Sequence, residues 1–263
     1  MAYDYELILV NVRDSVATVT LNRPPLNPLN GRLFMEIALC AEELNLDDNV
    51  RAVVLTGGDK HFAAGADIKE LESFTAVEVA KFIRTAQASF TKVENIPKPV
   101  IAAINGFALG GGCELAICAD FRYASEEAQI GQPEILLGII PGAGGTQRLP
   151  RLIGPAWAKE MIYSGRFYSA KECFDMGLVQ KVVDKDKSVI GVAQKVAARY
   201  AKGAAVALAE AKLAVNRGMD CGKEEGLIIE AQGIALCFAS EDQKIGMRTF
   251  LEKGPGKAEF TGR

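Results

Sequence analysis

The order of hydrophobic and polar positions predicts two strands and a helix at the start of the chain. Residues 6–12 and 15–22 are short runs rich in β-formers, and the polar pair Arg13-Asp14 between them predicts a hairpin. The apolar positions further on have helical spacing, and Asn30 could cap this helix. Its stripe consists of Leu33, Phe34, Ile37, Ala41 and Leu44.

Uninterrupted apolar runs further along the chain predict buried strands. Such runs occupy residues 52–57 and 100–104, a helical stretch near 75–94 lies between them, and a third strand is expected around 121–123. Strands that alternate with helices favour an α/β fold with buried, largely parallel strands. From about residue 186 the pattern predicts helices only, one of them with the stripe Leu227, Ile228, Ala231, Ile234, Ala235 and Phe238.

The composition is that of an ordinary globular protein, since 49% of the 263 residues are hydrophobic and 24% are charged. A net charge of −3 provides no basic field for nucleic acid or for an anionic membrane. No run approaches the roughly 18 apolar residues of a membrane span, and no signal-type core comes after the acidic amino end. We therefore expect a cytoplasmic protein.

The six cysteines include no Cys-x-x-Cys pair, which favours buried free thiols over disulfides.

Several kinds of catalytic site can be excluded from the residues that are missing. His61 is the single histidine, so any histidine triad or histidine-rich metal site depends on it, and we interpret it as an incidental surface residue. There is no Gly-x-Ser-x-Gly elbow and no Gly-Lys-[Ser/Thr] phosphate loop, and the glycine clusters at 110–112 and 142–145 both miss Gly-x-Gly-x-x-Gly. Carboxylates and backbone amides remain as the candidate chemistry.

The segment 105–116 runs from a buried strand through three glycines into a helix-compatible stretch. Glycines let a ligand approach the main chain closely, and the free N–H groups of a helix start suit an oxyanion such as that of a thioester carbonyl. Glu114 comes about one turn later and could lie beside the same ligand. The alternative is a tight strand–helix turn with a solvated glutamate.

Two further segments carry glycines and acidic residues. Residues 63–70 could supply another amide donor, with Asp67 as a cap for the next few residues, although the segment could equally be only a loop. Residues 131–145 place Glu134 between a proline and an apolar run, where desolvation would raise its pKa and suit a proton donor. The alternative is a surface glutamate at a helix start, whose pKa the helix dipole would lower. Together the three segments favour a site built from two carboxylates and main-chain amides.

In these three segments the sequence resembles the enoyl-CoA hydratase (crotonase) family. The matching stretches are 62–70, 99–115 and 131–149, and the similarity extends over nearly the whole chain. The resemblance implies an α/β, crotonase-like spiral of ββα turns with a C-terminal helical oligomerisation unit. It implies a core with the active site at residues 1–195 and a helical trimerisation region at 196–263. A homo-hexamer built as a dimer of trimers is the usual assembly.

The resemblance also assigns catalytic roles. Main-chain N–H groups of Ala66 and Gly111 would form the oxyanion hole for the thioester oxygen. Glu114 and Glu134 would be the acid/base pair, with Glu134 delivering a proton to C2 and Glu114 partnering the water that attacks C3. The N–H of Gly142 would help to hold that water.

The same resemblance implies how coenzyme A is bound. Main-chain groups of Ala64, Ala66 and Ile68 resemble the adenine contacts of the family, and Arg23 would lie near the CoA phosphates. Phe250 and Lys253 resemble carboxyl-terminal residues that reach CoA on a neighbouring subunit. Coenzyme A is then part of the acyl-CoA substrate, and no metal or redox cofactor is expected.

Both carboxylates of the pair are present, which favours an enoyl-CoA hydratase over an enoyl-CoA isomerase or an acyl-CoA hydrolase of the same family. A non-catalytic or RNA-binding member is disfavoured by the negative net charge and by the intact glutamate pair. Pro28 stands where alanine is common in the family, and Ile139 where threonine is frequent. These two departures leave the acyl-chain preference open.

Overall fold

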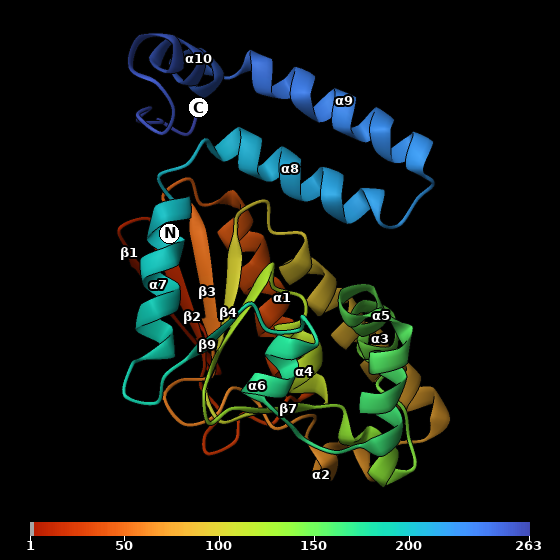
Figure 1. The fold of residues 1–263 in the computed structure, drawn as a ribbon. Helices are drawn as coiled ribbons and strands as arrows, with labels where there is room; N and C mark the ends of the chain where they lie inside the picture. The colour runs from red at the N-terminus through yellow and green to blue at the C-terminus, as the bar shows by residue number, and fades with distance from the viewer. Residues whose placement is uncertain (1–2) are drawn as a thin grey trace.

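The computed structural model describes residues 3–263. Its large sheet has six strands in the order β1-β2-β3-β4-β6-β9 (Figure 1). In this sheet β1 and β2 pair antiparallel, and the other neighbouring strands are parallel. The predicted hairpin and the parallel strands are therefore confirmed, with the hairpin turn at Asp14 and Ser15, which both have positive φ. The strands are β1 Ile8–Arg13, β2 Val16–Leu21, β3 Ala52–Thr56, β4 Val100–Ile104, β6 Phe121–Ser125 and β9 Lys181–Val183.

Helices cover both faces of this sheet. Alternate residues of β4 point to opposite sides, because side chains alternate along a strand. Ile101 and Ala103 pack with α7, whereas Val100 and Ala102 pack with the core that contains α1 and α3. The helices of the body are α1 Gly31–Leu46, α2 Ile68–Leu71, α3 Ala76–Glu94, α4 Gly111–Ala116, the 3-10 helix η1 Pro133–Leu137, α5 Gly145–Ser164, α6 Ala170–Asp175 and α7 Val189–Tyr200.

A second, three-stranded sheet positions the glycine segments. It consists of β5 Phe107–Leu109, β7 Gln129–Gly131 and β8 Tyr168–Ser169 in the order β5-β7-β8. Each of two successive chain turns runs from a strand of the large sheet to a strand of the small one and then into a helix: β4-β5-α4 and β6-β7-η1. The sequence pattern did not reveal these strands, because two or three residues are too few to show a period.

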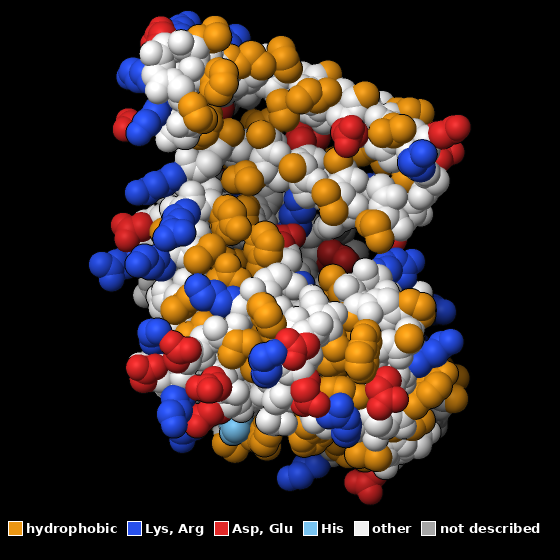
Figure 2. Space-filling view, viewed as in Figure 1, with side chains coloured by type: hydrophobic (Ala, Val, Ile, Leu, Met, Phe, Trp, Pro, Cys, Tyr) orange, Lys and Arg blue, Asp and Glu red, His pale blue; other side chains and the backbone are white. Residues whose placement is uncertain are grey.

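Three helices form the carboxyl-terminal part: α8 Ala205–Gly218, α9 Lys223–Ala239 and α10 Glu241–Lys253. They extend away from the sheets, with α8 and α9 side by side (Figure 1). The predicted boundary at residue 195 falls inside α7, whose Val189, Ala193 and Ala197 are buried against the large sheet. The predicted apolar stripe of α9 is largely exposed on this chain: Leu227, Ile228, Ile234 and Phe238 are each more than half exposed. In Figure 2, hydrophobic side chains gather over these helices.

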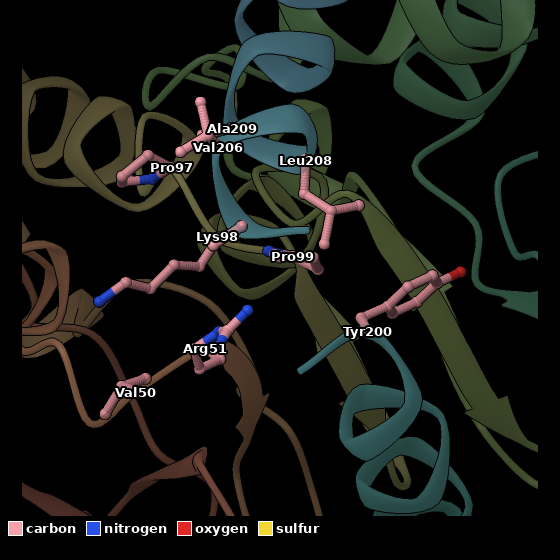
Figure 3. Close-up of a pocket in the computed structure, with 10 residues that line it drawn as sticks. Val50, Arg51, Pro97, Lys98, Pro99, Tyr200, Val206, Leu208 and Ala209 are labelled. Carbon is pink, nitrogen blue, oxygen red and sulfur yellow. The ribbon is translucent and has the colours of Figure 1, made fainter. Parts of the chain in front are cut away.

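The amino end of α8 meets the body at an apolar cavity of about 220 Å³ (Figure 3). Leu208 of α8 lies there opposite Pro97 and Pro99, and Arg51 donates hydrogen bonds to the carbonyl oxygens of Gly203 and Thr261. The cavity contains none of the predicted site residues. The hydrogen bonds of Arg51 connect the body to the carboxyl-terminal part of the chain.

Four of the six cysteines are buried free thiols, as predicted: Cys40, Cys113, Cys118 and Cys173. Cys237 is half-buried and Cys221 is exposed, so the prediction does not hold for them. Among residues 3–263, no helix is long and apolar enough to cross a membrane.

Candidate active site

The three glycine-bearing segments meet around one cavity of about 150 Å³. Ala64, Ala66 and Ile68 reach it from the loop before and the start of α2, and Gly111 and Glu114 from α4. Glu134 of η1 and Gly142 complete the polar part of its wall. Apolar side chains line the remainder: Phe34, Leu71, Phe82, Ile83, Leu137, Ile139 and Ile140.

Glu114 lies in the first turn of α4 and is only 3% exposed. Its Oε1 accepts a 2.7 Å hydrogen bond from the main-chain N–H of Gly145, the first residue of α5. Burial raises the pKa of Glu114 from 4.5 to about 7, although the amides of Ala143, Gly144 and Gly145 favour its charged form. The alternative of a solvated glutamate at a tight strand–helix turn is therefore wrong, because Glu114 is buried.

Glu134 faces the same cavity from the start of η1. Burial raises its pKa from 4.5 to about 8, and the nearby charge of Glu114 acts in the same direction. The desolvated carboxyl group was one of the two alternatives for Glu134, and it is the one observed. Gly110 packs so closely that a Cβ there would lie 2.9 Å from Oε1 of Glu134.

Gln132 lies within one of the matching stretches but was given no predicted role, and it holds Glu134. Its side chain is fully buried, and with its NH₂ group turned toward the carboxylate it donates to Oε1 and Oε2 at 3.0 and 3.1 Å. A buried amide must have partners, because an unpaired one costs about 1–3 kcal/mol. The only sequence signal was its place, two residues before Glu134.

Two main-chain N–H groups lie close together and free at the cavity. Leu29 donates to the carbonyl of Gly65 and accepts from the N–H of Asp67, which turns the N–H of Ala66 away from Leu29. Gly111 is the first residue of α4, where N–H groups have no intrahelical partner. A Cβ on Gly111 would lie 3.7 Å from the nitrogen of Ala66. Within residues 3–263 neither N–H donates to a protein group, so both can bind an oxygen atom of a ligand.

His61 is not an incidental surface residue. Its ring stacks on Phe107 with centroids 4.7 Å apart, and its Nδ1 accepts a hydrogen bond from the N–H of Phe107. Gly106 fits against it, since a Cβ there would meet Nδ1 at 2.3 Å. The ring therefore packs the loop before Ala63 onto β5, next to the glycine turn.

The residues that resemble CoA contacts are found in two places. Ala64 and Ile68 line the cavity, and Arg23 lies beside them, bonded through Nη2 to Asp67 at 2.6 Å. Phe250 and Lys253 are exposed on α10, at the opposite end of the molecule from α2 (Figure 1). They do not reach the cavity of their own chain.

Two free amides in the same cavity as two desolvated carboxyl groups suit an enzyme that polarises a carbonyl group and moves protons beside it. The chain belongs to the enoyl-CoA hydratase/isomerase family, whose model matches residues 11–263. This match confirms the family predicted from the sequence.

Known proteins of this kind are similar over nearly the whole chain. A crotonyl-CoA hydratase from Syntrophomonas wolfei is 45% identical over 261 residues, covering 98% of this chain and 99% of that protein. A short-chain-enoyl-CoA hydratase from Clostridium acetobutylicum is 44% identical over 248 residues, covering 94% and 95%. The crystal structure of an enoyl-CoA hydratase from Bacillus anthracis is 39% identical, covers 98% of this chain and 100% of that chain, and gives a TM-score of 0.92. The predicted crotonase-like fold is confirmed.

Proposed function

We propose that this chain catalyses the reversible addition of water to the 2,3-double bond of a 2-enoyl-CoA, which gives a 3-hydroxyacyl-CoA. One observation carries the proposal: Glu114 and Glu134 line the same cavity as the free N–H groups of Ala66 and Gly111. The similarity to proteins named as hydratases supports the same reaction.

The two amides bind the thioester oxygen in this proposal. Attack at C3 moves negative charge through C2 onto that oxygen, and preorganised donors stabilise charge that develops in the transition state. N–H groups of Ala66 and Gly111 meet this need without reorganisation, because each is already free and each is fixed by its backbone. Loss of one such donor typically costs about 10²–10³ in rate.

The two glutamates divide the proton transfers. With pKa values raised to about 7 and about 8, the pair holds about one proton at a pH between these two values. Ionised Glu114 takes a proton from water as its oxygen bonds to C3, and protonated Glu134 gives a proton to C2. The N–H of Gly142 helps to hold the water. The carboxylates titrate as a coupled pair, so the two values belong to the pair.

The CoA moiety extends from the cavity along the loop before α2. Main-chain groups of Ala64, Ala66 and Ile68 hold the adenine, and Arg23 lies near the phosphates. Phe250 and Lys253 act on the CoA of a neighbouring subunit, which fits their place far from their own cavity. Coenzyme A is part of the substrate, and the chemistry uses only carboxylates, amides and water, with no metal or redox cofactor.

The chain acts as a homo-oligomer, a hexamer made from two trimers. Exposed apolar side chains on α8, α9 and α10 support this, because monomers rarely leave so much contiguous apolar surface in water. These side chains include Leu213, Val215, Leu227, Ile228, Ile234, Leu236, Phe238, Met247, Phe250 and Leu251.

Incubation with crotonyl-CoA tests the proposed activity. Hydration removes the conjugated enoyl absorbance and adds the mass of one water, without releasing free CoA thiol. Release of thiol would instead indicate hydrolysis, and conversion of a 3-enoyl-CoA without hydration would indicate an isomerase. No turnover with any 2-enoyl-CoA from short to long chains would remove the assignment.

A further inference from the structure

The turn Gly142–Gly145 supplies the amide that holds Glu114. The carbonyl groups of this turn, which have no part in the proposed mechanism, are bound by side chains of α3 and α5. Gln87 of α3 donates from Nε2 to the carbonyl oxygen of Gly142 at 2.7 Å. Arg148, in the first turn of α5, donates from Nη1 to the carbonyl oxygen of Ala143 at 3.2 Å. Two side chains thus hold the carbonyl groups of the turn.

Arg148 is itself held by α3. Its Nε and Nη2 donate to Oε2 of Glu94 at 3.0 and 2.8 Å, and Nη2 also donates to Oγ1 of Thr91 at 3.1 Å. The Arg148 side chain is only 15% exposed. A guanidinium group with several fixed partners has a single orientation, so Arg148 links α3 rigidly to the turn.

One face of α3 carries all three residues that bind the turn or Arg148. Gln87, Thr91 and Glu94 are separated by four and three residues, which places them on one face. The other face of α3 is apolar and packs into the core through Phe82, Ala86, Phe90 and Val93. The helix therefore connects the hydrophobic core to the turn.

Gly144 and Arg148 fit each other closely. Gly144 has a φ of +123°, and a Cβ built there would lie 2.0 Å from Nη1 of Arg148. Any side chain at this position would displace the guanidinium group. The glycine thus lets Arg148 pack directly against the backbone that presents its N–H groups to Glu114.

We propose that Arg148 and Gln87 are positioning residues for hydration, which fix the turn Gly142–Gly145 so that its amides hold Glu114 and the attacking water. This inference rests on the proposed function for its kinetic test. The hydrogen bonds of Arg148 go to Glu94, Thr91 and the turn, so it acts on Glu114 through the backbone of the turn.

Arg148 also contributes charge. Its guanidinium favours the ionised form of Glu114 and lowers the pKa of that carboxyl group, against the effect of burial. The other titratable groups near Glu114 are Glu134 of η1 and the buried thiols Cys113 and Cys118, whose own pKa values burial raises. Removal of Arg148 should leave Glu114 with a higher pKa, because its guanidinium group favours the ionised form of that carboxyl group.

Arg148→Met, Arg148→Lys and Gln87→Ala test the proposal in the full-length protein. For Arg148→Met we expect kcat for crotonyl-CoA to fall about 10-fold or more, since small misplacements of catalytic groups are costly. The acid limb of kcat/KM should move up by about 0.5 pH unit or more. Arg148→Lys should restore most of the pH profile but less of kcat, because lysine keeps the positive charge but lacks the planar set of N–H donors of the guanidinium group. Gln87→Ala should lower kcat with an unchanged pH profile.

Arg151→Met is the matched control, since Arg151 lies one turn further on α5 and pairs with the exposed Asp220. It should leave kcat and the pH profile unchanged. Wild-type kcat and pH profile in Arg148→Met would overturn the inference. If Arg148→Met does not fold, Arg148→Lys and Gln87→Ala provide the test. Wild-type kinetics in both of these variants would overturn the inference.

Failure of the proposed function has a different signature, namely a wild-type protein without turnover. In that case NMR titration of ¹³C-labelled glutamate carboxyl groups tests the inference, because it measures the pKa of Glu114 without substrate. A higher pKa of Glu114 in Arg148→Met than in Arg151→Met supports the action of Arg148 on Glu114, and equal values contradict it.

Discussion

The N–H of Gly145 donates a 2.7 Å hydrogen bond to Oε1 of Glu114, so the first residue of α5 holds a carboxyl group that α4 carries. The bond partly offsets the desolvation of Glu114, whose pKa burial raises to about 7. A base that is held in one orientation and titrates near neutral pH is suited to deprotonating water. The hydrogen bond joins α4 to α5 through two residues that are 31 positions apart in the sequence.

Glu114→Gln should lower kcat for crotonyl-CoA by about 10²–10⁴-fold, the usual range for a general acid or base. Glutamine can still accept from Gly145 but cannot take a proton from water. Steady-state kinetics measure the effect. Glu127→Gln is the control, because Glu127 is an exposed glutamate in the connection between β6 and β7. Equal rates in the two variants would move the chemistry away from Glu114.

Glu134→Gln should also lower kcat by about 10²–10⁴-fold, for loss of the proton donor to C2. The wild-type dependence of kcat/KM on pH should be bell-shaped, with apparent limbs near 7 and 8 that belong to the coupled pair. In Glu134→Gln the alkaline limb should disappear, since no acid remains to be deprotonated. A wild-type alkaline limb in this variant would assign that proton to another group.

Glu114→Gln should make the protein more stable at alkaline pH. Below pH 4.5 the carboxyl group is protonated in both the folded and unfolded states. Between pH 4.5 and about 7 only the unfolded state ionises, so folding stability is lost as pH rises. This loss is roughly 3 kcal/mol at most, and glutamine avoids it. Urea unfolding of both proteins at pH 4.5 and pH 8 should show the advantage of the variant growing with pH, and a constant difference would contradict the buried, desolvated carboxyl group.

Gly110→Ala should impair catalysis through Glu134. The new Cβ would lie 2.9 Å from Oε1 of Glu134, so the carboxyl group must move. Gly138→Ala is the control for a positive φ without a contact, because Gly138 has open space where its Cβ would stand. Alanine is more strained at Gly110, whose ψ is −124°, than at Gly138, whose ψ is 20°. The kcat of each variant is therefore compared with its own loss of stability, and only Gly110→Ala should lose kcat beyond that loss. Equal kinetics in the two variants would contradict the close packing against Glu134.

The sequence predicted the parts of this protein that depend on local pattern. Residues 52–57 and 100–104 read as buried strands because both faces are covered, which leaves a continuous apolar run. Glu114 and Glu134 were found because glycines and a proline surround them. The small sheet was missed, since its strands are two or three residues long.

Long-range contacts are what the sequence could not provide. Arg148 and Glu94 are 54 positions apart, and no local period links them. The apolar stripe of α9 was visible in the sequence, but whether it faces the core or solvent depends on which chains pack against it. The buried role of Gln132 likewise depends on the spatial position of Glu134.

The most direct test of the central claim is hydration of crotonyl-CoA in solvent labelled with ¹⁸O and deuterium, with the product analysed by mass spectrometry. The account predicts one ¹⁸O atom at C3 and one deuterium atom at C2 at early times. It also predicts that Glu114→Gln and Glu134→Gln each slow both incorporations together. Labelled oxygen in a free carboxylic acid, or product without label at C3, would contradict the account.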